Sequence, residues 1–551
     1  MISSLHGAPA FLPWPYLDAM YDYLPLLRGP LGHVPVEARS KRVAIVGAGA
    51  AGLVAAHELL KVGVTPTVFE ASERWGGRLY TRPFTEADGR PAAAFAELGA
   101  MRFPPSARVF FHYARAFGLV LSDDFPDPGL VDTLLHYENK SHFWPARQVV
   151  PAEFGEVQRN WEAFISPLVR KIQEPWRAGD LAAVQRIWQS YLSRYQAMSF
   201  YEALHSESAV WTDEDLDRFG SLGIGTGGMG PLYGVAFTEI LRIVLHAWER
   251  DQKLVACGAG SLTDAFMGRR VDTPLGPLSL EDCGALRLGL EIVEIISRTG
   301  ATPELCYRRQ RGGPIERESF DAVVVATTTR AMQLMGLTLP AWQGGSAVAP
   351  PVRTAMRHLH HLSSSKLFIR TETKFWKGTH LPRVMLTDEL PRAVYLLDYP
   401  QTDNGVVCMS YSWGDDSVKL LALEPREQFE VIKRTIRRIH PDLGEALRPI
   451  NDEILAVSWE LEPHYHGGFK LQLPGQDDDV RELYFQFLSV LSPETDSGVY
   501  LAGDSVSWSG GWVEGALQTG LNAASAVIRR IGGELPPGSP LEQRPHRYQY
   551  L

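Results

Sequence analysis

The chain reads Val43-Ala-Ile-Val46-Gly47-Ala-Gly49-Ala-Ala-Gly52 after a basic pair near its start, and this stretch decides the fold. The four apolar residues at 43–46 predict a buried parallel strand, because such strands read as uninterrupted apolar runs. Residues 53–62 have the composition of a helix. A strand, a glycine turn and a helix in this order point a helix N-terminus at a pyrophosphate group. We therefore predict a nucleotide-binding unit that begins at residue 41.

The three glycines of this turn have separate roles. Gly47 permits the tight turn, Gly49 lets the backbone approach phosphate, and Gly52 lets the helix pack close to the strand. A second predicted strand, 66–70, ends on Glu70, which is placed to accept a hydrogen bond from a ribose 2′-hydroxyl. These features predict a dinucleotide site without separating NAD from FAD.

The residues that follow the second strand favour FAD. They read Ala71-Ser-Glu-Arg74-Trp-Gly76-Gly77-Arg78. Two adjacent glycines beside arginines allow backbone amides to crowd a diphosphate that continues into a flavin.

The composition indicates a globular protein with a small-molecule substrate. The chain has 551 residues, enough for two interwoven units, and its net charge of -10, without a long Lys/Arg block, argues against a nucleic-acid partner. No apolar window is long enough for a membrane span, and the first basic residue, Arg28, comes too late for a secretion signal. We therefore expect a cytoplasmic protein with no membrane partner. The sequence leaves open whether it forms a homodimer.

Neither a metal site nor a disulfide framework is expected. The cysteines are scattered without CxxC spacing, at Cys257, Cys283, Cys306 and Cys408. Histidines cluster at 358–361 and 464–466, but the first cluster has no carboxylate at ligand spacing and oxidation at a flavin needs no metal.

Taken together, these motifs resemble the amine oxidase family of FAD flavoproteins, which contains the monoamine oxidases and the L-amino acid oxidases. Within that family the chain is most similar to the bacterial L-amino acid 2-monooxygenases. The resemblance runs from Tyr21 to Gly533. The stretches that carry it are Glu97-Leu-Gly99-Ala-Met-Arg102-Phe-Pro-Pro, Gly220-Ser-Leu-Gly-Ile-Gly-Thr-Gly-Gly228, Ser364-Ser-Lys366-Leu-Phe, Ser410-Tyr411-Ser-Trp413, Ala502-Gly503-Asp504 and Gly510-Gly-Trp512-Val-Glu-Gly515-Ala.

The resemblance implies an α/β fold, an α+β composite in which a discontinuous Rossmann-like FAD-binding domain is interleaved with a substrate domain of mixed sheet and helices. We assign to the FAD-binding domain residues 41–110, 251–334 and 481–535. The substrate domain takes residues 111–250 and 335–480, with its helical part at 150–250. Residues 1–40 form an N-terminal arm and residues 536–551 a C-terminal tail.

The resemblance also places Arg102, Tyr411 and Lys366 on the substrate side of the flavin. Arg102 is implied as the ligand of the substrate carboxylate, and a bidentate guanidinium suits this role because it fixes both position and plane. Tyr411 is the implied second carboxylate contact, through its hydroxyl. From the residues alone, an ion pair of Arg102 with Glu97 and core packing of Tyr411 stay open.

Lys366 lies in an otherwise uncharged run that predicts a strand entering a core, so its ammonium needs a specific partner. In the family a lysine at this place holds a water near flavin N5 that assists reoxidation by oxygen. Burial would lower its pKa. The alternative is a lysine at a strand end that reaches solvent.

The C-terminal motif is implied to serve the flavin ring and the substrate wall. Asp504 should bond the ribityl or phosphate end, while Gly510, Gly511 and the following helix N-terminus direct amides at the N1/C2 carbonyl edge, where negative charge gathers on reduction. Trp248, Trp459 and Trp512 are expected to wall the substrate cavity. The implied cofactor contacts are Gly47, Gly49, Ala51, Gly52, Glu70, Ala71, Arg74, Gly77, Arg78, Gly99, Ala100, Met101, Arg102, Val293, Gly503, Asp504, Gly511, Trp512, Val513 and Ala516.

The activity that the resemblance implies is oxidation of a free L-amino acid by hydride transfer to flavin, followed by reoxidation with O2. No general base is needed if the substrate amine is neutral, because the protein then supplies orientation and dryness. The products are the amide and CO2 in a 2-monooxygenase, or the 2-oxo acid, ammonia and H2O2 in an oxidase.

The region after Gly228 suggests the substrate side chain. Lysine-using relatives carry an aspartate near residues 230–232, and this chain has none, so lysine should be rejected. We expect an aromatic substrate, tryptophan before phenylalanine. The alternatives are a lysine- or phenylalanine-type amino acid monooxygenase or oxidase, a monoamine or polyamine oxidase, an NAD-dependent dehydrogenase, and a non-catalytic flavoprotein.

Overall fold

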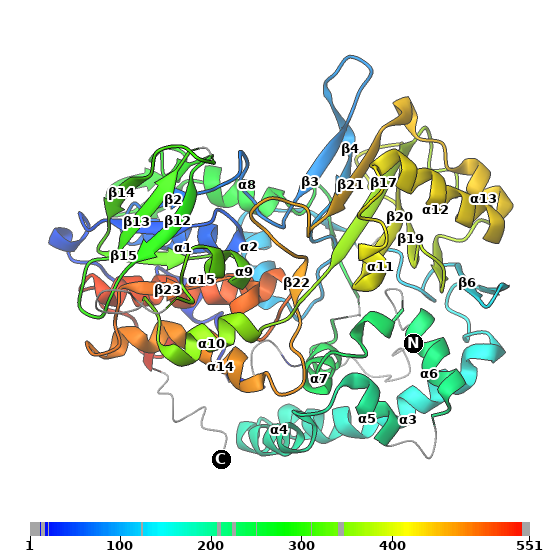
Figure 1. Ribbon diagram of the computed structural model, residues 1–551, viewed down its shortest axis with the longest axis horizontal. Coiled ribbons are helices and arrows are strands. Elements are labelled where there is room, and N and C mark those ends of the chain that lie inside the picture. The colour runs from blue at the N-terminus through cyan, green and yellow to red at the C-terminus, as the bar shows by residue number, and fades with distance from the viewer. Residues whose placement is uncertain are drawn as a thin grey trace.

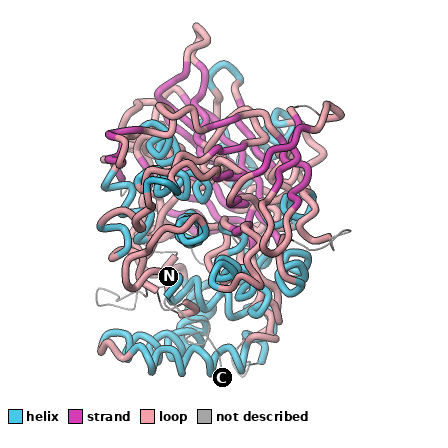
Figure 2. Tube along the Cα trace, turned by 90° about the vertical axis from the view of Figure 1, so that its left-hand side faces the viewer, coloured by secondary structure: helices cyan, strands magenta, loops and turns pink. Residues whose placement is uncertain are grey.

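The computed structural model describes residues 12, 17–19, 21–122, 125–206, 211–222, 228–248, 251–309, 311–339 and 347–542. The chain passes repeatedly between one lobe built on a parallel sheet and a second lobe built on a mixed sheet, with a group of helices below them (Figure 1). A view turned by 90° again shows a helical layer beneath the strands (Figure 2). Residues 223–227 of the glycine-rich stretch quoted above lie outside the described residues.

The parallel sheet forms the core of the first lobe. Its strands, in spatial order, are β11 (Leu286–Arg287), β2 (Thr67–Phe69), β1 (Val43–Val46), β15 (Ala322–Val325) and β23 (Val499–Leu501). The predicted strand at 43–46 is confirmed and is fully buried between β2 and β15. The helix predicted at 53–62 starts earlier, as α1 (Ala50–Lys61), because Gly49 is its N-cap.

Two long buried helices cover this sheet in contact with each other. α15 (Val513–Arg530) follows the C-terminal glycine motif and packs against α1. A Cβ on Gly520 would lie 2.4 Å from Val54 Cγ1 and 2.5 Å from the Ala51 carbonyl oxygen, so only glycine permits this approach. The two termini of the nucleotide unit are thus joined across the core.

The mixed sheet forms the second lobe. Its strands are, in order, β21 (Ile454–Ser458), β17 (Ser364–Thr371), β20 (Gly405–Trp413), β19 (Ala393–Leu397), β18 (Val384–Thr387), β6 (Thr133–Tyr137) and β7 (Lys140–Trp144). β17 and β20 are antiparallel, and Lys366 is the direct partner of Tyr411. Directly opposite residues project from the same face of a sheet, so these two side chains are neighbours. The helix α12 (Pro425–Ile439) packs its apolar side chains against this sheet.

The helical layer is confirmed within residues 150–250. Its members are α3 (Ala152–Arg177), α4 (Leu181–Tyr195), α5 (Phe200–Ser206), α6 (Asp213–Leu222) and α7 (Phe237–Leu245). They share an apolar core with Trp161, Trp188 and Phe237 at its centre.

The remaining elements connect these layers. The helices are α2 (Arg108–Ala116), α8 (Ser261–Gly268), α9 (Thr329–Leu334), α10 (Pro350–His358), α11 (Asp415–Val418), α13 (Pro441–Ala446) and α14 (Asp477–Tyr484). The strands are β3 (Thr81–Thr85), β4 (Pro91–Glu97), β5 (Leu121–Ser122), β8 (Leu254–Val255), β9 (Val271–Thr273), β10 (Gly276–Leu278), β12 (Glu291–Ile296), β13 (Glu304–Arg308), β14 (Glu316–Ser319), β16 (His361–Leu362) and β22 (Phe469–Lys470).

Two segments pack outside the domain to which the sequence assigned them. α10 was placed in the substrate domain, yet its buried side chains join the core of β15 and β23. The hairpin of β3 and β4 was placed in the FAD-binding domain, yet Phe84 and Phe95 pack with the mixed sheet. An apolar helix face or hairpin face shows that a segment is covered, not which sheet covers it.

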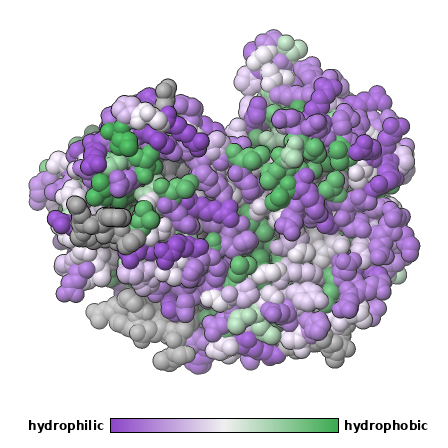
Figure 3. All heavy atoms as spheres, viewed as in Figure 1, coloured by the Kyte–Doolittle hydropathy of each residue, from purple (hydrophilic) through white to green (hydrophobic). Residues whose placement is uncertain are grey.

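The described residues include no helix that is long and apolar enough to cross a membrane. The face seen in Figure 3 is largely hydrophilic, with apolar side chains gathered in patches on both lobes.

Candidate active site

A cavity of about 620 Å³ lies between the two lobes and the helical layer. It begins where β1, β2, β15 and β23 end, with Gly47, Glu70, Thr327 and Gly503 on its wall. Ligands of parallel α/β sheets bind outside the carboxyl ends of the strands, and this volume is ordinary for a ligand pocket. The cavity then extends past Lys366 toward α7.

The glycine turn forms a narrow cradle at one end of the cavity. Gly47 has φ 101° and donates its N–H to the Phe69 carbonyl at 2.7 Å. A Cβ on Gly77 would lie 3.1 Å from Gly49 Cα, so side chains at this point would fill the cradle. The Glu70 carboxylate accepts from Ala48 N at 2.8 Å and is 8% exposed. The cradle therefore fits a diphosphate approached by bare backbone, as a flavin dinucleotide requires.

Two predicted cofactor residues do not line the cavity. Gly52 instead allows helix–strand packing, because a Cβ there would lie 2.0 Å from the Gly47 carbonyl oxygen. Arg74 donates to the Gly77 carbonyl at 2.8 Å and lies over the Tyr80 ring at 3.7 Å. Its guanidinium thus supports the turn, and contact of Arg74 with the cofactor stays a prediction.

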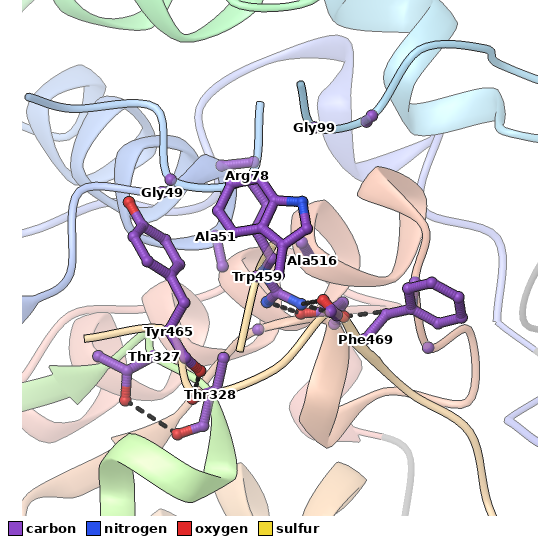
Figure 4. Close-up of a pocket in the computed structure, with 18 of the residues that line it drawn as sticks. Gly49, Ala51, Arg78, Gly99, Thr327, Thr328, Trp459, Tyr465, Phe469 and Ala516 are labelled. Carbon is purple, nitrogen blue, oxygen red and sulfur yellow. Dashed lines mark hydrogen bonds and ion pairs between the residues drawn. The ribbon is translucent and has the colours of Figure 1, made fainter. Parts of the chain in front are cut away.

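Arg78 joins three distant segments at the cavity wall. Its Nη1 lies 3.1 Å from Asp504 Oδ2 and donates to the Gly468 carbonyl at 2.8 Å. Gly511 N also donates to Asp504, at 3.2 Å. Burial alone would raise the pKa of Asp504, but the Arg78 guanidinium and these hydrogen bonds lower it overall. Figure 4 shows Arg78 with Trp459, Tyr465 and Phe469, side chains contributed by both lobes.

Lys366 is buried on β17, with 4% of its surface exposed, so the solvent-reaching alternative is wrong. Its Nζ donates to the carbonyl oxygens of Glu97 at 3.1 Å and Gly99 at 2.5 Å. The ammonium lies 4.6 Å from the centre of the Tyr411 ring. The pKa of Lys366 is lowered to about 8, because burial and, to a smaller extent, the charge of Arg102 outweigh the opposing effects of Cys408 and Glu97.

The Glu97 carboxylate is bound elsewhere than to Arg102. Ala259 N donates to it at 2.6 Å and Thr81 Oγ1 at 2.8 Å. Burial raises its pKa to about 7. The structure therefore does not support the Arg102–Glu97 ion pair that the sequence left open.

Arg102 lines the cavity with 8% of its surface exposed. The next residue, Phe103, is fixed by a 2.9 Å hydrogen bond from its N–H to the Lys253 carbonyl. The guanidinium carbon lies 5.2 Å from the centre of the Phe125 ring. Arg102, Lys366 and Tyr411 thus share one section of the cavity wall.

The three predicted tryptophans also line the cavity. Trp459 is 3% exposed and donates its indole N–H to the Leu98 carbonyl at 3.2 Å. Trp248 and Trp512 contact each other with ring centres 5.1 Å apart. The other predicted cofactor residues on the wall are Gly47, Gly49, Ala51, Glu70, Ala71, Gly77, Arg78, Gly99, Ala100, Met101, Val293, Gly503, Asp504, Gly511, Val513 and Ala516.

The sequence did not single out several wall residues. They are Trp161 of α3, Met229, Leu232, Ile240, Ile243 and Val244 in and before α7, Trp413 of β20, and Phe469 with Leu471 near β22. Helical spacing would have placed Ile240, Ile243 and Val244 on one face, and strand alternation would have paired Trp413 with Tyr411. Trp161 has no such local signal.

Charges along the described wall are unequally distributed. Its acids are Glu70, Glu291 and Asp504, which lie at the strand ends or pair with Arg78. The section near α7 combines Arg102 and Lys366 with apolar and aromatic side chains. That section is suited to a small molecule with a negative group and a flat apolar group.

Comparison with known proteins gives one family and several close relatives. Residues 50–528 match the model of the family described as flavin containing amine oxidoreductase. The chain is 38% identical to tryptophan 2-monooxygenase of Pseudomonas savastanoi over 97% of this chain and 99% of that protein. It is 25% identical to the L-amino-acid oxidase of Gloydius halys over 92% and 93% of the two chains.

Among solved structures, a triple mutant of putrescine oxidase is similar with a TM-score of 0.65 and 17% identity, covering 89% of this chain and 99% of that chain. Cyclohexylamine oxidase from Brevibacterium oxydans IH-35A is similar with a TM-score of 0.62 and 17% identity, over 88% and 98%. These similarities support the α/β fold expected from the sequence.

Proposed function

Because the chain belongs to the flavin containing amine oxidoreductase family, we propose that it is an FAD-dependent enzyme that oxidises a free aromatic L-amino acid, tryptophan preferred. The observation that carries this proposal is the section of cavity wall that combines Arg102, Lys366 and Tyr411 with aromatic side chains in contact with one another. When bound, the flavin accepts a hydride from the substrate Cα and is reoxidised by O2.

FAD is the flavin that the cavity favours. The glycine cradle and Glu70 suit an adenosine diphosphate end, and Trp512 with the N-terminus of α15 stands at the opposite end. The turn before α15 has no side chains at Gly510 and Gly511, which line the cavity, so the N-terminus of α15 can approach a ring edge that becomes negative on reduction. A mononucleotide would leave the cradle without a function.

Arg102 and Tyr411 are assigned to the substrate carboxylate. The guanidinium is buried on the cavity wall, where a charge-assisted bidentate pair is strong and directional. Tyr411 lies beside Lys366 on the paired strands β20 and β17, and its hydroxyl offers a second donor. Together they fix the amino acid so that its Cα hydrogen faces the flavin.

Lys366 is assigned to the oxygen half of the reaction. Its ammonium is bound by two backbone carbonyls at the cavity wall, so its third proton can hold a water molecule. A positive charge in a dry cavity stabilises the negative charge that develops as oxygen is reduced.

The wall near α7 is assigned to the substrate side chain. Trp161, Ile240, Val244 and Trp248 offer apolar area and ring edges, which favour a flat substrate by about 0.5–1.5 kcal/mol per ring pair. A lysine ammonium in that place would be desolvated without a described acidic partner on the wall.

Oxygen uptake with a panel of L-amino acids tests the proposal. Product analysis distinguishes the amide of a 2-monooxygenase from the 2-oxo acid of an oxidase. We expect specificity constants in the order tryptophan, phenylalanine, then aliphatic residues, with lysine and arginine far behind. Lysine as the best substrate would contradict the side-chain assignment and leave the flavoenzyme assignment intact.

A further inference from the structure

The side chain of Arg102 needs support beyond its backbone. The chain after it is fixed by the pairing of Phe103 with Lys253. Several rotatable bonds nevertheless separate the guanidinium from that backbone, and a bidentate contact requires one plane. The side chains packed on the guanidinium therefore help to fix its plane at the cavity wall.

Phe125 is the aromatic face on which the guanidinium lies. The distance from Arg102 Cζ to the Phe125 ring centre is 5.2 Å, within the range of a cation–π contact. Phe125 is 4% exposed and packs on Tyr395 of β19 with ring centres 5.3 Å apart. Tyr395 is fully buried in the mixed sheet. The ring is thus held by the sheet and in turn faces the arginine.

The neighbouring cation has the same kind of support. Lys366 Nζ lies 4.6 Å from the Tyr411 ring centre, and the positive charge of Arg102 disfavours the charged form of Lys366. Two cations that repel each other in a buried wall each need an attraction that holds them in place. A ring face adds an attraction of this kind without being an anion itself.

On the basis of the proposed function, we propose that Phe125 is a positioning residue, whose ring holds the Arg102 guanidinium in the one plane that binds the substrate carboxylate. It touches neither the substrate nor the flavin in this role. Its effect should therefore appear in the recognition of negative charge and not in the affinity for an aromatic ring.

The test compares two ligands of nearly equal shape, indole-3-acetate and indole-3-acetamide, by the change they cause in the flavin absorbance of the oxidised holoenzyme. Phe125→Leu removes the ring face and keeps an apolar side chain. Phe125→Met does the same with a flexible side chain and serves if the leucine variant does not fold. Phe125→Tyr keeps the face.

Phe84 offers a matched control. The Arg370 guanidinium carbon lies 5.9 Å from the Phe84 ring centre, and both side chains are buried beside the same apolar cluster. Neither residue lines the cavity. Phe84→Leu should therefore lose about as much folding stability as Phe125→Leu, without a change in the affinity for either ligand.

We expect Phe125→Leu and Phe125→Met to lower the affinity for indole-3-acetate by roughly tenfold and the affinity for indole-3-acetamide by less than about twofold. Phe125→Tyr should restore the preference. KM for L-tryptophan should rise in proportion, while the rate of flavin reduction at saturation changes less.

Three results would overturn the inference. If the Phe125 variants lost affinity equally for both ligands, the substitution would have damaged the cavity in general. If their preference for the carboxylate ligand were unchanged, other groups would hold Arg102. If the wild-type protein itself did not prefer the carboxylate, the proposed carboxylate site would fail, and Phe125 would lose its role with it.

Discussion

In the described part of the chain two lysines are almost completely buried, Lys366 with 4% and Lys470 with 0% of its surface exposed, yet they have different surroundings. Lys366 lines the cavity and donates to two backbone carbonyls. Lys470 lies 3.8 Å from the buried Glu239 carboxylate, within a network of charged side chains. Burial lowers the pKa of both.

The network around Lys470 is organised by Arg242. Arg242 binds Asp18 through two nitrogens at 2.8 and 2.9 Å and Asp477 at 2.8 Å. Its guanidinium carbon lies over the rings of Trp188 and Trp508, 5.0 and 4.8 Å from their centres. These contacts join the segment before residue 20, the helical layer and the parallel-sheet lobe.

The comparison shows that burial alone does not tell whether a charged side chain is structural or functional; its partners do. Both lysines lie in uncharged runs of sequence, and both would be predicted as buried. Lys470 lies beside the Glu239 carboxylate and serves the packing of the lobes, whereas Lys366 is held at the cavity wall by two backbone carbonyls. The predictions below test this division, from the largest expected effect to the smallest.

The first prediction concerns the structural network. Arg242→Met leaves Asp18, Asp477 and Glu239 buried with too little positive charge, so the free energy of unfolding should fall by about 3–5 kcal/mol. Urea unfolding measures this. Arg270→Met, which removes an exposed ion pair with Asp282, is the control and should change little. Equal stability of both variants would show that the network does not hold the lobes.

The second prediction concerns the cavity wall. Arg102→Ala should cost about 2–5 kcal/mol of transition-state binding, because a rigid ion pair to the substrate is lost. The flavin content should stay near that of the wild type. Steady-state kinetics with L-tryptophan measure the loss, and unchanged kcat/KM would return Arg102 to a structural role.

The third prediction separates the two lysines directly. Lys366→Met should slow reoxidation of the reduced flavin by roughly 100-fold, because a charge placed for oxygen reduction is removed. Lys470→Met should leave that rate near the wild-type value. Rapid mixing of each pre-reduced protein with oxygen gives both rates, and equal slowing of the two variants would abolish the distinction between the lysines.

The fourth prediction uses pH. The pKa of Lys366 falls from 10.5 to about 8 on folding, so between these values the unfolded chain binds more protons than the folded one. Stability therefore rises with pH in this window. The melting temperature of the wild type should rise relative to that of Lys366→Met as the pH increases from 8 to 10.5. Below pH 8 the difference between the two melting temperatures should not change in this way. A constant difference across the whole range would contradict the shifted pKa.

Much of the nucleotide half could be predicted from sequence because its determinants are local. The positive φ of Gly47 and the close contact at Gly52 are properties of a short motif. The side-chain wall depends on contacts between distant segments, such as Trp161 on α3 and Phe125 beside β19. The position of Arg74 over the Tyr80 ring could likewise not be read from the sequence, because the contact depends on how the chain turns after Gly77.

The central claim is that the cavity wall recognises an amino acid and not merely an amine. Anaerobic mixing of the oxidised holoenzyme with L-tryptophan or with tryptamine, which lacks the carboxylate, tests it most directly. Flavin absorbance should bleach with L-tryptophan, and with tryptamine at least about 100-fold more slowly under subsaturating conditions. Equal rates, or bleaching by tryptamine alone, would contradict the assignment of Arg102 to a substrate carboxylate.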